Sequence, residues 1–167
     1  MQDELRSYIK SNGERVEKHI ARGEIMGLLL CLIGIFMMMQ KFAHHAPLMI
    51  TGLSLLAFVY AFHGNFLADI FEIKEQRFLV LSLRASYIAL AVTTLGILFK
   101  LQNWTGGSYM LLAGCAASGV FFLFFVYKLF LGKLEDEQMR ILINNLIVRM
   151  LPALLIVAFL VTSVLYA

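Results

Sequence analysis

The sequence predicts an all-α fold, an integral membrane bundle of five transmembrane helices. Hydrophobic residues make up 60% of the 167 residues, charged residues only 15%, and the mean hydropathy is +0.81. A soluble domain of this size could not enclose so much apolar surface, so the bilayer must surround most of the chain. Crossing about 30 Å of hydrocarbon takes about 20 residues of apolar helix. Five stretches approach or exceed that length, residues 25–42, 47–66, 78–99, 108–131 and 143–167.

Residues 1–24 carry mixed charges and precede the first apolar stretch. They predict a cytoplasmic amphipathic helix, because four apolar side chains fall near one helical face, those of Leu5, Ile9, Val16 and Ile20. This helix either lies on the inner leaflet or extends the first span into the cytoplasm, and Asn12 and Gly13 could break it. So long a charged segment is not the pattern of a cleaved signal peptide, so the first stretch is expected to remain as a span.

The distribution of Lys and Arg predicts which way the chain crosses the membrane. With the N-terminus in the cytoplasm, only Lys41 and Lys100 of the fourteen Lys and Arg lie outside. Because cytoplasmic flanks hold the positive excess, we expect a bacterial inner-membrane protein with its N-terminus in and its C-terminus out. After the N-terminal helix, the predicted regions are a first hairpin with its cytoplasmic loop at 25–77, a second at 78–142 and a fifth span at 143–167.

An internal repeat of 62 positions relates the two predicted hairpins. The shift aligns Arg22 with Arg84, Gly34 with Gly96, Gln40 with Gln102, Gly52 with Gly114 and Glu75 with Glu137, and it places Phe42 opposite Trp104. Each copy contains two spans and therefore starts and ends on the same side of the membrane. The sequence thus predicts a parallel repeat of helical hairpins rather than an inverted one.

The fourth apolar stretch is rich in small residues. Gly114, Ser118 and Gly119 lie among several small side chains that are spaced four positions apart. This spacing lets helix backbones approach one another, so the three residues are predicted to mediate helix packing. The alternative is a small-residue face that lines a pore.

Ionisable side chains inside a membrane usually have a function, because burying a charge there is costly. The five predicted stretches contain no Asp or Glu. Asp69 and Arg84 lie near the facing ends of the second and third stretches, where they could form an ion pair across the short connection. The alternative is that Arg84, like Arg149, reaches the inner headgroups with its long side chain.

Sulfur and imidazole side chains gather at the outer end of the first stretch. Met37, Met38, His44 and His45 are candidate metal ligands, and thioether and imidazole groups suit copper. Methionines that end an apolar helix more often face lipid, however, and these residues do not make a closed ligand set. No metal and no cofactor are therefore expected.

The sequence contains none of the short motifs that mark common active sites, neither GxSxG, a P-loop, HExxH nor a Gly-rich dinucleotide turn. The connections between the spans leave no room for a catalytic domain. The net charge of +3 does not indicate nucleic-acid binding, because the basic residues flank the spans instead of forming a stripe with aromatic residues. The sequence therefore predicts a protein that is not an enzyme and binds no nucleic acid.

The most distinctive connection joins the third and fourth stretches and reads FKLQNWTGG, residues 99–107. Trp104 at a membrane boundary anchors a helix end among the headgroups, and Lys100 can extend to the same level. Gly106 and Gly107 allow the tight reversal that two antiparallel helices need. These four residues are predicted to form a membrane-interface anchor and turn.

The order of these residues resembles the FK-x-x-HWPGA segment that joins the two spans of GldL-type proteins, which belong to the bacterial gliding-motility and type IX secretion apparatus. Four residues match, Phe99, Lys100, Trp104 and Gly106, whereas Asn103 and Thr105 stand in place of the His and the Pro. The resemblance covers residues 88–126. It implies a periplasmic turn, in agreement with the orientation predicted from charge.

GldL-type proteins form the stator-like ring of a proton-driven motor, together with a single-span partner that has a large periplasmic part. Such a motor needs an embedded carboxylate, which the third and fourth stretches lack. The chain also lacks the family's long cytoplasmic tail and adds three other spans. The resemblance therefore implies a related hairpin and not the motor itself.

The predicted function is that of a structural or accessory subunit of a membrane assembly. Such a subunit contacts the lipid bilayer and a membrane-protein partner or a second copy of the chain. A small transporter or channel is the alternative, with a path lined by Thr93, Thr94, Ser118, Asn144 and Asn145. A third option is a membrane anchor for a signalling partner, which would bind the basic N-terminal helix.

Overall fold

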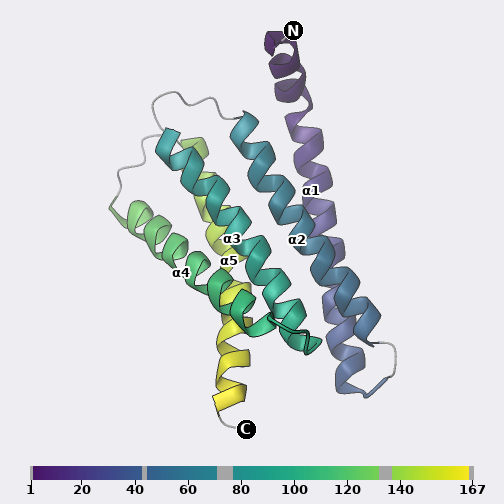
Figure 1. Ribbon diagram of the computed structural model, residues 1–167. Helices are drawn as coiled ribbons and strands as arrows, with labels where there is room; N and C mark the ends of the chain where they lie inside the picture. The colour runs from purple at the N-terminus through teal and green to yellow at the C-terminus, as the bar shows by residue number, and fades with distance from the viewer. Residues whose placement is uncertain (1, 43–44, 71–76, 132–136, 166–167) are drawn as a thin grey trace. The chain divides into compact units, whose positions relative to one another are not determined.

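Five long helices make up the described part of the chain, which covers residues 2–42, 45–70, 77–131 and 137–165 of the computed structural model (Figure 1). They are α1 (Gln2–Met39), α2 (His45–Ile70), α3 (Arg77–Leu101), α4 (Gly107–Phe130) and α5 (Glu137–Leu165). Each is long and apolar enough to cross a membrane. The predicted all-α fold with five transmembrane helices is confirmed.

The candidate spans within these helices agree with the predicted stretches except near the two ends of the chain. They are Lys18–Met39, His45–Phe66, Phe78–Leu101, Gly107–Phe130 and Met139–Ala158. The first begins at Lys18, earlier than predicted, within α1, a continuous helix that Asn12 and Gly13 do not break. The N-terminal segment therefore extends the first span as part of the same helix, which is one of the two predicted arrangements.

The helices divide into two compact units, residues 1–84 and 85–167. The first unit holds α1, α2 and the first two turns of α3, and the second holds the rest of α3 with α4 and α5. This boundary falls about two helical turns after the predicted border between the hairpins at residues 77 and 78. A hydrogen bond from Arg84 to Asn65 of α2 ties the start of α3 to the first unit.

Glycines bring the backbones of α1 and α2 together. Gly52 of α2 faces Cys31 of α1, and a Cβ atom at Gly52 would lie 2.9 Å from the Cys31 backbone nitrogen. Gly34 of α1 faces Met49, and a Cβ atom there would lie 2.6 Å from Met49 Cγ. Neither position has room for a side chain, so the two helices pack at the short distance that small residues allow.

The same pairing recurs between α3 and α4. A Cβ atom at Gly114 would lie 2.6 Å from the Thr93 backbone nitrogen, and one at Gly96 would lie 2.6 Å from Leu111 Cα. Each of these four residues lies 62 positions after its counterpart in the first hairpin. The scattered sequence identities predict a repeat, and the close contacts between the helices repeat with the same offset.

The ends of the helices repeat with the same offset. Helix α1 ends at Met39 and α3 at Leu101, while α2 begins at His45 and α4 at Gly107. Both members of each pair are 62 positions apart. The two hairpins therefore share the position of their turns as well as their close contacts.

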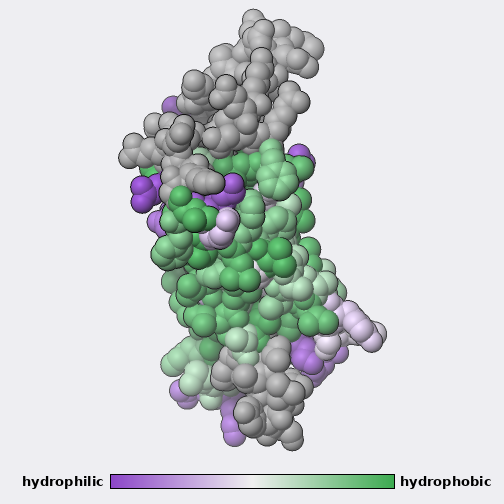
Figure 2. Space-filling model, turned by 90° about the vertical axis from the view of Figure 1, so that its left-hand side faces the viewer, coloured by the Kyte–Doolittle hydropathy of each residue, from purple (hydrophilic) through white to green (hydrophobic). Residues whose placement is uncertain are grey.

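The outward face of α4 is apolar along its whole length. Its exposed large side chains include those of Tyr109, Leu112, Val120, Leu123 and Phe130. Figure 2 looks from the side on which α4 lies in Figure 1 and shows a band of hydrophobic side chains with hydrophilic ones beyond both ends. Such a surface is expected of helices that face lipid.

Candidate functional site

The turn between α3 and α4 ends α3 with a Schellman motif. Asn103 adopts a left-handed conformation with a φ of 52°. Its N–H donates to the Lys100 carbonyl at 3.2 Å, and the N–H of Trp104 donates to the Phe99 carbonyl at 2.9 Å. Asn is one of the few residues other than Gly that tolerate this conformation, so the backbone geometry accounts for its presence here.

Trp104 packs on the helix that it terminates. Its ring meets that of Phe99 edge to face, with 4.9 Å between the centroids and 69° between the planes. This contact is the apolar pairing that often accompanies a Schellman motif. The Trp104 side chain remains 47% exposed. The residue predicted as an interface anchor therefore has a second role as part of the cap of α3.

A small hollow of about 250 Å³ opens beside this turn. Lys100 reaches across it, and its Nζ atom donates a hydrogen bond to Ser108 Oγ in the first turn of α4 at 3.1 Å. Gly106 has a φ of 83°, and a Cβ atom at Gly107 would lie 2.8 Å from the Phe99 carbonyl carbon. The turn thus requires both glycines, one for its conformation and the other for lack of space.

The turn between α1 and α2 is closed in the same way. Lys41 has a φ of 58° and lies 62 positions before the left-handed residue of the other turn. Its N–H donates to the Met38 carbonyl and that of Phe42 donates to the Met37 carbonyl, both at 3.0 Å. The repeat therefore includes the hydrogen bonds of the helix cap.

Replacing Lys41 with Gly is expected to raise the free energy of unfolding by about 1 kcal/mol, because the left-handed conformation costs an ordinary side chain about 1–2 kcal/mol. Asn103→Gly should give a clearly smaller gain, since Asn tolerates that conformation. SDS-induced unfolding of the detergent-solubilised protein, followed by circular dichroism, measures both. Gln40→Gly, one position before the left-handed residue, is the control and should lower stability. The same gain from all three substitutions would contradict the role of the turn conformation.

Arg84 binds α2 through Asn65. Its Nη2 atom donates to Asn65 Oδ1 at 2.5 Å, and Asn65 Nδ2 donates to the Ala61 carbonyl at 2.9 Å. The Asp69 side chain lies outside the described residues, so the ion pair between Asp69 and Arg84 stays a prediction. Sequence reasoning did not single out Asn65, although its place four residues before Asp69 puts both on one face of α2.

A second arginine contact lies within the second unit. Arg149 of α5 donates from Nη1 to the hydroxyl of Tyr87 in α3 at 2.9 Å. Tyr87 is 1% exposed and Arg149 is half-buried. The guanidinium is thus bonded to α3. The alternative in which Arg149 reaches the inner headgroups stays a prediction. Nothing in the sequence pattern marks Tyr87 as its partner.

Three of the candidate metal ligands can be placed. Met37 is half-buried, Met38 is exposed and His45 begins α2. His45 Nδ1 donates to the Phe42 carbonyl at 2.8 Å, which leaves Nε2 as the acceptor nitrogen of the ring. His44 lies outside the described residues. Within the described ranges no group of three His, Cys, Asp or Glu side chains could hold a metal ion.

The three small residues of α4 that were predicted to pack differ in their surroundings. Gly114 and Ser118 are buried against α3. Ser118 Oγ donates to Thr93 Oγ1 at 2.8 Å, because the Thr93 proton is donated to the Ala89 carbonyl, also at 2.8 Å. A Cβ atom at Gly119 would meet nothing within 4 Å. Among the described residues, Gly119 therefore has no close packing partner.

One carboxylate falls inside a candidate span, whereas the predicted stretches contain none. The candidate span of α1 begins at Lys18 and so includes Glu24, which is half-buried. Glu24 lies about 22 Å along the helix from Met39, given 1.5 Å per residue. This distance places Glu24 in the N-terminal part of the span and not at mid-depth.

Comparisons of the chain with protein-family models, curated proteins and solved structures found no match. The resemblance of residues 99–107 to GldL-type proteins therefore stays a prediction from the sequence. The structure shows a multi-pass membrane protein with five helices, four of which form two hairpins with the same internal packing.

Proposed function

We propose that the protein is a non-enzymatic structural or accessory subunit of a membrane assembly in the bacterial inner membrane. The observation that carries the proposal is the closure of both hairpins by backbone contact at glycine. Helices packed this closely form stiff pairs and leave their outer faces for lipid or for neighbouring subunits.

The hydroxyl groups within α3 and α4 support the same role. Thr93 and Thr94 each donate to a carbonyl one turn earlier in α3 at 2.8 Å, and Ser118 is bonded to Thr93. Hydroxyls that are used in this way stabilise packing and offer little to a passing solute. Asn144 and Asn145 are exposed on α5. A small transporter or channel remains the rival function.

In the proposed orientation, the N-terminus is cytoplasmic and the turns of both hairpins face the periplasm. The support is the distribution of charge, since Lys41 and Lys100 are the two cations of the turns and the other twelve Lys and Arg belong to the opposite side. The likeness of residues 88–126 to GldL-type proteins supports a related hairpin whose turn is periplasmic. The motor activity is not part of the proposal.

Purification in mild detergent, followed by size-exclusion chromatography and mass spectrometry, tests the proposal. We expect the chain to elute in fixed stoichiometry with another membrane protein or with further copies of itself. Tyr109→Ala, at the α3–α4 turn and 82% exposed, should weaken this association, whereas Phe42→Ala at the first turn, 56% exposed, is the matched control. A partner-free monomer that supports solute flux in proteoliposomes would favour the transporter instead.

A further inference from the structure

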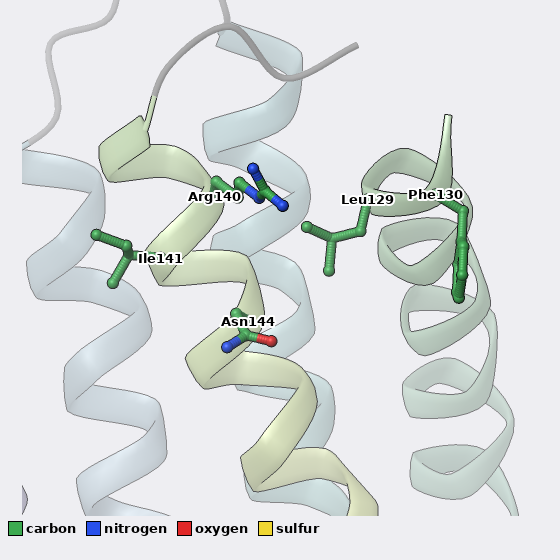
Figure 3. Close-up of a pocket in the computed structure, with 5 residues that line it drawn as sticks. All are labelled: Leu129, Phe130, Arg140, Ile141 and Asn144. Carbon is green, nitrogen blue, oxygen red and sulfur yellow. The ribbon is translucent and has the colours of Figure 1, made fainter. Parts of the chain in front are cut away.

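A hollow of about 630 Å³ lies between the end of α4 and the start of α5, both in the second unit. Five described residues line it, Leu129, Phe130, Arg140, Ile141 and Asn144. Figure 3 shows Arg140 extending from α5 toward α4, with Leu129 extending from α4 toward it. Asn144 lies one turn farther along α5, so the two polar side chains share a face of that helix.

The lining combines strong hydrogen-bond donors with apolar walls. The Arg140 guanidinium carries five N–H donors and the Asn144 amide carries two. No hydrogen bond or ion pair joins either side chain to another described residue. The apolar side chain that faces Arg140 is that of Leu129, whereas those of Phe130, 87% exposed, and Ile141, 54% exposed, extend away from it (Figure 3). A molecule that fits this hollow has an anionic, hydrogen-bond-accepting group next to an apolar part.

The level of the hollow in the membrane identifies such a molecule. Phe130 is the last residue of the candidate span in α4, and Arg140 is the second residue of the span in α5. The hollow therefore lies where hydrocarbon gives way to headgroups, and lipid phosphates occupy this level. Arg binds phosphate through two parallel N–H···O bonds, which suits a phosphodiester held from one side.

We propose that this hollow binds a membrane phospholipid. Its phosphodiester oxygens accept hydrogen bonds from Arg140 and Asn144, and its apolar part contacts Leu129, which extends from α4 toward Arg140 (Figure 3). All of the described residues of the site come from α4 and α5.

Native mass spectrometry of the purified full-length protein tests this proposal. Phosphatidylglycerol or phosphatidylethanolamine is added in detergent, and the lipid-bound fraction is measured before and after detergent exchange. We expect one phospholipid to survive the exchange on the wild-type chain. Arg140→Gln should lower the affinity roughly tenfold, the loss expected when hydrogen bonds to a charged group are removed.

Two further variants separate this site from general effects. Lys128→Gln is the matched control, because Lys128 lies at the same end of α4 but has its Nζ atom 5.9 Å from the Phe124 ring centroid and does not line the hollow. It should retain the lipid. Leu129→Ala removes the apolar side chain that faces Arg140 and should weaken lipid binding, a result that tests the site even if Arg140→Gln fails to fold.

The outcomes decide between a lipid site and its alternatives. Loss of lipid in Arg140→Gln and Leu129→Ala, with retention in Lys128→Gln, supports the proposal. Equal retention in Arg140→Gln and the wild type overturns it, and so does an equal loss in Lys128→Gln, which would indicate a general basic surface. Displacement of the lipid by millimolar inorganic phosphate would also overturn it, because the site would then recognise a free anion.

Discussion

A leucine in place of Gly114 is expected to force α3 and α4 apart and to lower the free energy of unfolding by about 3 kcal/mol. The first added atom, Cβ, would already lie 2.6 Å from the Thr93 backbone nitrogen and 2.7 Å from Thr93 Cα. These are backbone atoms inside a helix, so they cannot rotate away as the end of a side chain can. SDS-induced unfolding followed by circular dichroism measures the loss.

Gly119→Leu is the matched control for this prediction. It makes the same change in the same helix at a position where an added Cβ atom meets nothing within 4 Å. Its effect should stay within about 0.5 kcal/mol, as for most substitutions away from packed contacts. Equal losses at Gly114 and Gly119 would show that the close approach of α4 to Thr93 is not the cause.

Removal of one oxygen atom is expected to have the second-largest effect. Tyr87→Phe keeps the aromatic ring, which is 1% exposed, but removes the hydroxyl that accepts a hydrogen bond from Arg149. A hydrogen bond to a charged group contributes about 1.5–3 kcal/mol, and the half-buried guanidinium loses this partner where little water can replace it. The same SDS titration should show a loss in that range.

A second substitution and a control test the Tyr87 prediction. Tyr109→Phe removes a hydroxyl from a side chain that is 82% exposed and should leave stability unchanged. Arg149→Gln should cost less in the Tyr87→Phe background than in the wild type, because the two residues act as a pair. Fully additive losses would contradict the contact between Arg149 and Tyr87.

The spans and the repeat could be predicted because they depend on sums over many residues. Hydropathy averaged over about 20 positions tolerates an error at either end, and a shift of 62 positions is supported by several identities at once. The candidate span of α1 begins at Lys18, seven residues before the predicted start at residue 25. Arg22 and Glu24 interrupt the apolar run, but the backbone hydrogen bonds of a helix continue through polar side chains.

The partners of single side chains could not be predicted, because they depend on how each helix is rotated about its axis. Gly114 and Ser118 are four positions apart and share a face, whereas Gly119 lies about 140° around the helix from Gly114. The pattern of small residues includes both of these helix faces, so it does not indicate which face packs against α3. For the same reason, the charge of Arg84 suggested Asp69 as a partner, and its contact with Asn65 became visible only with the helices in place.

The matching hairpins have a consequence for how the protein is made. Contacts such as that between Gly34 and Met49 join residues that are close in sequence, so the first hairpin has its close contacts as soon as α2 has been synthesised. The chain can therefore enter the membrane as two successive pairs of helices, each with its own close contacts. Duplication of one such pair requires no reversal of the second copy, because each pair returns the chain to the side from which it started.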